Sequence, residues 1–294
     1  MPIPSGIADA PRAPSPAGND QPVAKAGGPV ASRLADEIGG FVGDPNFMTS
    51  LARGLAVIRG FSQEQRRLSI AQLSQKTGIP RAAVRRVLYT LGRLGYVASE
   101  DGRHYALQPR LLGLGHAYLS STPLVIKAQP YLDQVSEAVN DSCSLAMLEG
   151  DDILYLARSV TSRIISITLN VGGRLPAYCT SIGQVLLAEL PEPELEAYLA
   201  RVRINRFTDR TPASAATLRA LLAKVRDDGY ALADQQMELG VISLAVPVRD
   251  VLGRAVAGMN VIAQTGRGSA PQLLTQCLPP LKAAAATLSA QLLP

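Results

Sequence analysis

Arginine side chains crowd one short segment of this sequence. Arg81, Arg85 and Arg86 lie close together, and Arg103 follows further along the chain. A guanidinium group presents a planar fork of N–H donors that fits phosphate oxygens and the O6 and N7 acceptors of guanine. The chemistry indicated by these residues is therefore recognition of double-stranded DNA, without bond making or breaking.

The positive charge of the chain is concentrated around these arginines. Residues 46–110 hold eleven Lys and Arg against three Asp and Glu, whereas the whole chain has a net charge of only +5. Residues 1–45 and 111–294 are both slightly acidic. A charge run on a helix is often only a solvated face, but a basic block inside a near-neutral chain is typical of a nucleic-acid-binding module.

A helix-turn-helix pattern surrounds the arginines. Ser50 can cap a first helix. Ser69 and Gln72 have the spacing of a capping box, which predicts that a second helix opens at Ser69. Gly78 can take the left-handed conformation that ends a helix, and Pro80 suits the first turn of the next one. The turn between the second and third helices is therefore short.

The third helix is amphipathic and a hairpin follows it. Its apolar stripe consists of Val84, Val87, Leu88, Leu91 and Leu94, and Arg93 lies on the opposite face. Two short strands over 96–99 and 103–107 flank Asp101 and Gly102, a strong hairpin signal. Helix, turn, basic helix and hairpin in this order predict a winged helix-turn-helix.

In such a module the third helix enters the major groove and the wing reaches the neighbouring backbone. The short side chains of Ala82 and Ala83 allow a close approach to the bases. The residues predicted to contact operator DNA are Ser69, Arg81, Ala82, Ala83, Arg85, Arg86, Tyr89 and Arg103.

The rest of the chain predicts an α+β domain in which helices flank a mostly antiparallel sheet. A linker helix is predicted to precede a helix that starts at Pro123. Strands are predicted over 143–148, 153–159, 164–170, 230–233, 242–248 and 255–263, with helices over 181–189, 192–199 and 213–227 and a long helix from 271. The predicted organisation is a disordered extension (1–45), a DNA-binding domain (46–108), the linker helix (109–122) and an effector-binding domain (123–294).

Several classes of function are disfavoured by the composition. Three cysteines without a CxxC pair fit a reducing cytoplasm and argue against a zinc site or a disulfide framework. No apolar run approaches the roughly 18 residues of a membrane span, and the N-terminus lacks the pattern of a secretory signal. Cys179 stands at a predicted helix start, yet His104 and His116 both lie outside the large domain. We therefore expect a cytoplasmic protein with no enzymatic activity, cofactor, metal or membrane partner.

Three sequence blocks resemble one known family. The segment SLARGLAVIRGF with LSIAQLSQKTGIPRAAVRRVLYTLGRLGYV resembles the DNA-binding domain of the IclR family of bacterial transcriptional regulators. The segments GGRLPAYCTSIGQVLLAELPEPEL and DDGYALADQQMELGVISLAVPVRDVLG resemble its second half. The chain is most similar to the subgroup that controls aromatic-acid and β-ketoadipate catabolism. Members of that subgroup respond to protocatechuate, 4-hydroxybenzoate or β-ketoadipate, and many are activators.

The resemblance implies a homodimer or tetramer, a GAF-like effector domain and, for an activator, contact with RNA polymerase. The effector positions that it implies are Leu175, Ser181, Ile182, Ala233, Ser243, Asn260 and Ile262. The family often carries an acidic residue at the position of Gln236, so an electrostatic role there does not transfer.

The residues themselves point to the same region. A helix N-terminus near Ser181 offers free N–H groups that suit a carboxylate, although Thr180 and Ser181 serve equally well as caps. Tyr178 can stack on a ring or belong to the core, and Arg163 and Arg174 are candidate carboxylate partners that more often are structural. The predicted effector-binding residues are Leu175, Tyr178, Thr180, Ser181, Ile182, Ser243 and Asn260. The alternative is a DNA-binding protein that needs no ligand.

Overall fold

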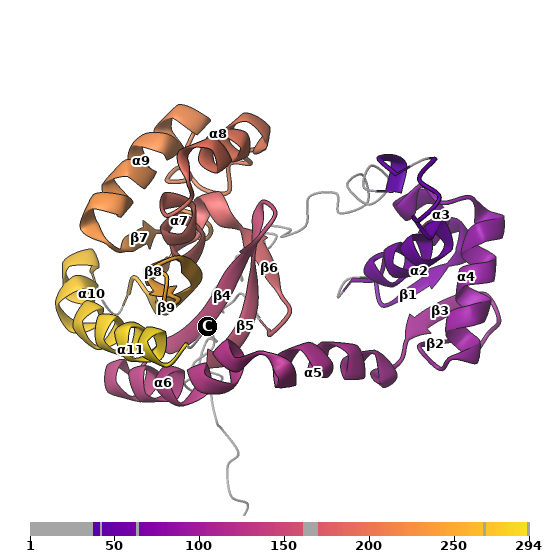
Figure 1. Ribbon diagram of the computed structural model, residues 1–294, viewed down its shortest axis with the longest axis horizontal. Helices are drawn as coiled ribbons and strands as arrows, with labels where there is room; N and C mark the ends of the chain where they lie inside the picture. The colour runs from indigo at the N-terminus through magenta and orange to yellow at the C-terminus, as the bar shows by residue number, and fades with distance from the viewer. Residues whose placement is uncertain (1–37, 42, 63–64, 161–169, 267–268, 293–294) are drawn as a thin grey trace, which may run out of the picture.

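The computed structural model describes residues 38–41, 43–62, 65–160, 170–266 and 269–292. Most of the predicted extension and nearly all of the predicted strand over 164–170 lie outside these residues. Figure 1 shows a small helical domain and a larger domain built around a sheet, joined by helix α5 (Leu112–Ser121). The expected α+β class, with an N-terminal winged helix-turn-helix and a linker helix, is confirmed.

In the part of the small domain from residue 49 to 107, helices α2, α3 and α4 and a three-stranded antiparallel sheet pack around one core. The elements of this part are α2 (Thr49–Arg59), β1 (Arg67–Ser69), α3 (Ile70–Thr77), α4 (Arg81–Arg93), β2 (Val97–Ala98) and β3 (His104–Leu107). The sheet order is β1-β3-β2. Val57, Leu73 and Val84, one from each helix, are completely buried together. The capping box of Ser69 and Gln72 is present, and Gly78 ends α3 with a φ of 70°.

Two local predictions in this domain are wrong, and one strand is missing from the prediction. Helix α2 begins at Thr49 with Met48 as its N-cap, so Ser50 does not cap it. Leu94 follows the end of α4 and is 51% exposed, because the apolar stripe loses its helical geometry there. Strand β1 was not predicted, since three residues carry no readable period and the strand exists only through its pairing with β3.

The large domain contains a six-stranded antiparallel sheet in the order β6-β5-β4-β9-β8-β7. Its strands are β4 (Ser142–Glu149), β5 (Asp152–Ser159), β6 (Arg174–Pro176), β7 (Ala231–Asp234), β8 (Val241–Arg249) and β9 (Ala255–Gln264). Its helical segments are α6 (Pro123–Val139), η2 (Ala177–Cys179), α7 (Ser181–Ala188), α8 (Glu192–Arg201), α9 (Ala215–Asp228), α10 (Ala270–Gln276) and α11 (Leu278–Gln291), and η1 (Pro109–Leu111) precedes α5.

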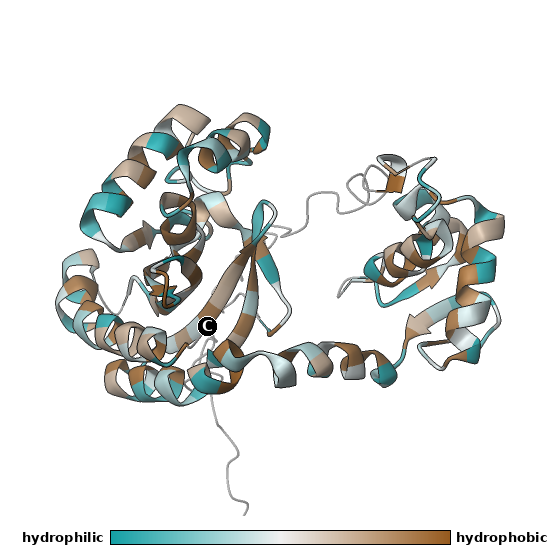
Figure 2. Ribbon diagram, in the orientation of Figure 1, coloured by the Kyte–Doolittle hydropathy of each residue, from teal (hydrophilic) through white to brown (hydrophobic). Residues whose placement is uncertain are grey.

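Two layers of helices cover the two faces of this sheet. Helices α6 and α11 pack on one face, while α7 packs on the other with α9 outside it. The long final helix that the sequence predicts is instead two helices divided at Cys277, because α11 starts with consecutive prolines that lack N–H groups for the ladder of α10. Figure 2 shows the hydrophobic residues gathered where the layers meet. None of the described helices is long and apolar enough to cross a membrane.

Helix α7 lies against its neighbours with almost no clearance. All of its residues are buried. A Cβ atom on Gly183 would lie 2.1 Å from the carbonyl oxygen of Ala177, and a Cβ atom on Gly258 in β9 would lie 2.8 Å from a methyl carbon of Ile182. Glycine at these two positions therefore sets the depth at which α7 sits on the sheet.

We predict that Gly183→Ala lowers the free energy of unfolding by about 1–3 kcal/mol or more, because the added methyl group overlaps backbone atoms that cannot move aside. Thermal and urea denaturation measure the change. The matched control is Gly54→Ala in α2, where no atom lies within 4 Å of the new methyl group and stability should stay level or rise slightly. Equal stabilities of the two variants would contradict the close packing of α7 against η2.

Candidate nucleic-acid interface and ligand pocket

The outer face of α4 is exposed and basic. Arg81, Ala82, Arg85, Arg86 and Tyr89 all face solvent, and the Tyr89 side chain is 69% exposed. The positions 82, 85, 86 and 89 follow helical spacing, so their side chains share one face. This face can enter a major groove and place two guanidinium groups against base edges or phosphates.

Hydrogen bonds in the turn set the angle between α3 and α4. The Ser74 hydroxyl donates to the carbonyl oxygen of Ile79 over 2.7 Å. The Thr77 hydroxyl donates to the Leu73 carbonyl oxygen over 2.7 Å and accepts from the Ile79 N–H over 3.4 Å. Because Thr77 and Ile79 are buried, these bonds are shielded from water and hold the two helices in a fixed crossing.

Asp101 organises the wing. One of its carboxylate oxygens accepts from the backbone N–H groups of Arg103 and His104 over 2.8 and 2.7 Å, and the other pairs with the His104 ring over 2.7 Å. These hydrogen bonds, those from His104 first, hold the pKa of Asp101 well below its ordinary value. Arg67 pairs with Glu100 and ties β1 to the same hairpin. The exposed Arg103 is thereby presented on a shaped turn.

Two of the predicted DNA contacts are placed less favourably. Ala83 is half-buried against the domain core, because it lies on the shoulder of the apolar stripe and not on the outer face. The Ser69 hydroxyl accepts from the Gln72 N–H over 3.3 Å in the capping box, so its oxygen is engaged at the start of α3. The outer face of α4 is accordingly formed by Arg81, Ala82, Arg85, Arg86 and Tyr89, while Arg103 lies on the wing.

A small cavity of about 40 Å³ lies on the α7 side of the sheet. Alternation along β9 places Met259 and Val261 in the opposite core, so Asn260 and Ile262 point toward α7. Ser243 pairs with Ile262 across the strands and faces the same way. The predicted residues that line the cavity are Leu175, Thr180, Ala233, Ser243, Asn260 and Ile262.

Three predicted effector residues do not line the cavity. The Tyr178 hydroxyl accepts from the N–H of Asn205 over 2.9 Å and donates to its carbonyl oxygen over 3.0 Å, and its ring stacks on Phe207. Tyr178 therefore anchors a loop, in agreement with the core alternative. Ile182 and Ser181 are fully buried in α7, where Ile182 packs beside Gly258. Spacing near a helix start does not reveal which side of the helix faces a cavity.

Thr180 shows the capping role. Its hydroxyl accepts from the Gly183 N–H over 3.3 Å and donates to the Pro176 carbonyl oxygen over 3.1 Å. Arg174 pairs with Glu149 at the surface and is not part of the cavity wall. Arg163 lies outside the described residues.

The sequence prediction missed half of the cavity wall. The missed residues are Tyr155, Cys179, Gln236, Met237, Glu238 and Val241. Three of them, Gln236, Met237 and Glu238, belong to the connection between β7 and β8, which folds back over the sheet through contacts with distant residues. The polar run QQME between two apolar strands was the available signal, since polar residues between paired strands often face a site.

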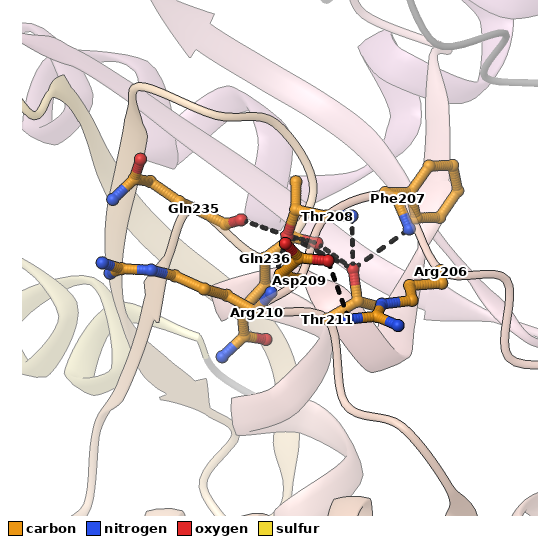
Figure 3. Close-up of polar contacts among 8 residues, drawn as sticks. All are labelled: Arg206, Phe207, Thr208, Asp209, Arg210, Thr211, Gln235 and Gln236. Carbon is orange, nitrogen blue, oxygen red and sulfur yellow. Dashed lines mark hydrogen bonds and ion pairs between the residues drawn. The ribbon is translucent and has the colours of Figure 1, made fainter.

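The β7–β8 connection is held by the segment 206–211, as Figure 3 shows. The Thr208 hydroxyl donates to the carbonyl oxygen of Gln235 over 2.6 Å, and the Thr211 hydroxyl donates to that of Gln236 over 2.7 Å. Thr211 in turn accepts from the N–H groups of Phe207 and Thr208. Gln235 has a φ of 56°, a conformation that non-glycine residues hold only when their surroundings impose it.

The cavity wall is mostly apolar, with a few polar groups and almost no charge. Among the described lining residues, Glu238 is the one Asp, Glu, Lys, Arg or His. Burial raises the pKa of Cys179 to about 12, so its thiol stays protonated and offers no thiolate nucleophile. Asn260 is only 3% exposed, and its Oδ1 atom has no hydrogen-bond partner in the part of the chain that the structure describes. A buried unpaired amide oxygen in a cavity wall suits a ligand that carries a donor.

In the part of the chain that the structure describes, no cluster of three His, Cys, Asp or Glu side chains is arranged to hold a metal ion. The cavity presents the amides of Gln236 and Asn260 and the hydroxyl groups of Thr180 and Ser243 beside apolar side chains. This arrangement is suited to binding a small polar molecule.

Comparison with known proteins covers both domains. Residues 50–101 match the IclR helix-turn-helix domain, and residues 116–290 match the bacterial transcriptional regulator IclR C-terminal domain. The chain is 51% identical over 265 residues to the Pca regulon regulatory protein of Pseudomonas putida, a match that covers 90% of this chain and 91% of the relative.

Two further similarities bear on the ligand. The p-hydroxybenzoate hydroxylase transcriptional activator of Acinetobacter baylyi is 33% identical over 81% of this chain and 89% of its own length. The crystal structure of an IclR homolog from Microbacterium hydrocarbonoxydans, complexed with 4-hydroxybenzoate, superposes with a TM-score of 0.71 at 25% identity. That match covers 83% of this chain and 98% of the homolog.

Proposed function

Because the chain belongs to the IclR family of bacterial transcriptional regulators, we propose that it regulates a catabolic operon for aromatic acids in response to a small organic acid. The relatives support this assignment, since one is an activator for p-hydroxybenzoate hydroxylase and another binds 4-hydroxybenzoate. The observation that carries the sensor role is the buried, unpaired Asn260 amide in the wall of the cavity. The protein acts in the cytoplasm, as a regulator and not as an enzyme.

On the DNA, the N-terminal half of α4 lies in the major groove of the operator. Arg85 and Arg86 read guanine edges or grip phosphates from its outer face, and Arg81 binds a phosphate. Arg103 on the wing contacts the adjacent backbone. An activator of this kind also contacts RNA polymerase.

In the sensor domain, the effector binds between α7 and the β7–β8 connection. Its hydroxyl group donates to Asn260 Oδ1, and its carboxylate takes the neutral donors of the wall. The cavity of about 40 Å³ is smaller than the roughly 150 Å³ known to hold a benzene ring. An aromatic acid therefore binds a conformation in which the wall is more open. Because the acid binds this open conformation more tightly than the closed one, it shifts the equilibrium toward the open conformation.

The protein functions as a homodimer or a higher assembly of dimers. Helix α5 supports this, because it is rich in apolar residues and none of its residues is buried within the chain. Leu112 and Leu114 are 75% and 55% exposed, and Leu51 and Leu55 on α2 are also exposed. A second copy that covers these side chains would place two α4 helices on an operator with two half-sites.

We predict that Arg85→Ala weakens operator binding by about 1–3 kcal/mol and relaxes the preference at one base pair. Fluorescence anisotropy with the intergenic DNA beside the gene, at fixed salt, measures the loss. Arg254→Ala is the matched control, because Arg254 is exposed in the other domain and pairs locally with Asp250. If Arg85→Ala binds as tightly as this control, Arg85 does not take part in readout.

We predict that 4-hydroxybenzoate, protocatechuate or β-ketoadipate raises the melting temperature and changes operator affinity, because a ligand that binds only the folded state stabilises it. In Asn260→Leu the preference for 4-hydroxybenzoate over benzoate should fall by about tenfold, since one buried hydrogen bond is lost. The variant should fold normally, because no hydrogen bond among the described residues uses the lost Oδ1 atom. Indifference to every acid would leave a ligand-independent DNA-binding protein.

We predict that Leu112→Glu shifts the protein toward monomers and weakens operator binding, since a buried unpaired carboxylate opposes association. Sedimentation velocity over a concentration series measures the shift. Leu252→Glu provides the control, because Leu252 is 72% exposed on the β8–β9 turn. Unchanged association of Leu112→Glu would exclude α5 from the interface.

A further inference from the structure

We propose that Gln184 is a positioning residue that turns the side-chain amide of Gln236 so that its NH2 group faces the carboxylate of a bound acid. This inference rests on the proposed effector site and assigns a specific task to a residue outside the cavity wall. None of the described residues in the cavity wall is Lys, Arg or His. The two N–H donors of Gln236 would then allow the cavity to bind an acid in preference to the corresponding amide.

The orientation starts at a backbone carbonyl group. Gln184 lies in the middle of α7 and is fully buried. Its Nε2 group donates to the Tyr178 carbonyl oxygen over 3.0 Å and to the Oε1 atom of Gln236. A carbonyl oxygen only accepts hydrogen bonds, so the end of the Gln184 amide that faces Tyr178 must be NH2.

The orientation of the Gln184 amide also determines the orientation of the Gln236 amide. Both hydrogens of the Gln184 NH2 group are engaged, so the atom of Gln236 that meets this group must be its oxygen. The NH2 group of Gln236 is then left with both donors. Among the described residues, no hydrogen bond uses this group.

The alternative orientation of the two amides is unfavourable. If Gln236 alone turned over, two NH2 groups would face each other. If both amides turned over, the Gln184 oxygen would face the Tyr178 carbonyl oxygen, with no hydrogen between them. In the observed orientation the Gln184 Oε1 atom has no hydrogen-bond partner among the described residues. The orientation is therefore set by the two acceptors that face the NH2 group, the Tyr178 carbonyl oxygen and Gln236 Oε1.

The backbone of Gln236 is fixed as well. Its carbonyl oxygen accepts from the hydroxyl groups of Thr211 over 2.7 Å and Thr208 over 3.4 Å (Figure 3). With the backbone carbonyl oxygen and Oε1 both held, the remaining polar group of the Gln236 side chain is its NH2, and the residue lines the cavity. A carboxylate is an acceptor-only group, so it matches this pair of donors.

The test compares matched acid and amide ligands by isothermal titration calorimetry with the full chain. The pairs are 4-hydroxybenzoate with 4-hydroxybenzamide, and adipate with adipamide. For Gln184→Met we expect the affinity for the acid that binds to fall about tenfold, as for the loss of a hydrogen bond to a charged group. Affinity for its amide should change less than about threefold, because an amide can donate as well as accept.

Two further variants keep the test independent of how Gln184→Met folds. Gln236→Met removes the donors directly and should give the same loss, and the double variant should lose no more than either single one, because the residues act in series. Gln236→Glu keeps an oxygen that accepts the hydrogen bond from Gln184 but has no N–H donors. This variant should therefore fold but no longer bind the acid. Gln276→Met, on the exposed end of α10, is the control.

Equal losses for acid and amide would show that Gln184 only packs, and they would overturn the positioning role while leaving the effector site in place. Additive losses in the double variant, or acid binding retained in Gln236→Glu, would also overturn it. If the wild-type protein binds neither member of either pair, and neither protocatechuate nor β-ketoadipate, the proposed effector site itself is wrong.

Discussion

The packing of α7 against the sheet is the constraint on which the sensor domain depends. The helix is buried along its whole length, and two glycines permit its contact with η2 and with β9. This depth brings Ile182 to the sheet and Gln184 to the β7–β8 connection. A cavity remains beside the helix, because β7, β8 and β9 carry the short or polar side chains of Ala233, Ser243 and Asn260 at this place. A methyl group at either glycine would displace the helix and the cavity together.

Polar groups inside this packing are few and specifically placed. Tyr178 ties the segment around Asn205 to the start of α7, and Thr208 and Thr211 tie the next residues to Gln235 and Gln236. The cavity wall is therefore one layer of a hydrogen-bonded network that reaches the outer loops. Any enlargement of the cavity must displace part of this network and so move the outer loops.

Much of the fold is readable from local patterns. Ser69 with Gln72, Gly78 and Pro80 mark the ends of α3 and the start of α4 because capping bonds, left-handed glycine and the missing N–H of proline act over a few residues. Where an element forms only because it pairs with a distant strand, as β1 does with β3, local patterns do not predict it. Consecutive prolines also divided a predicted single helix into α10 and α11.

The basic face of α4 follows from the sequence alone, because helical periodicity places Arg85, Arg86 and Tyr89 opposite an apolar stripe regardless of the rest of the chain. The cavity does not. Gln236 meets Gln184 across a separation of 52 residues, and no local rule states which strand neighbours which or how deeply a helix sits. The partners of a buried polar group are decided by long-range packing, so tertiary structure alone separated the Tyr178 anchor from the wall and added Gln236 to it.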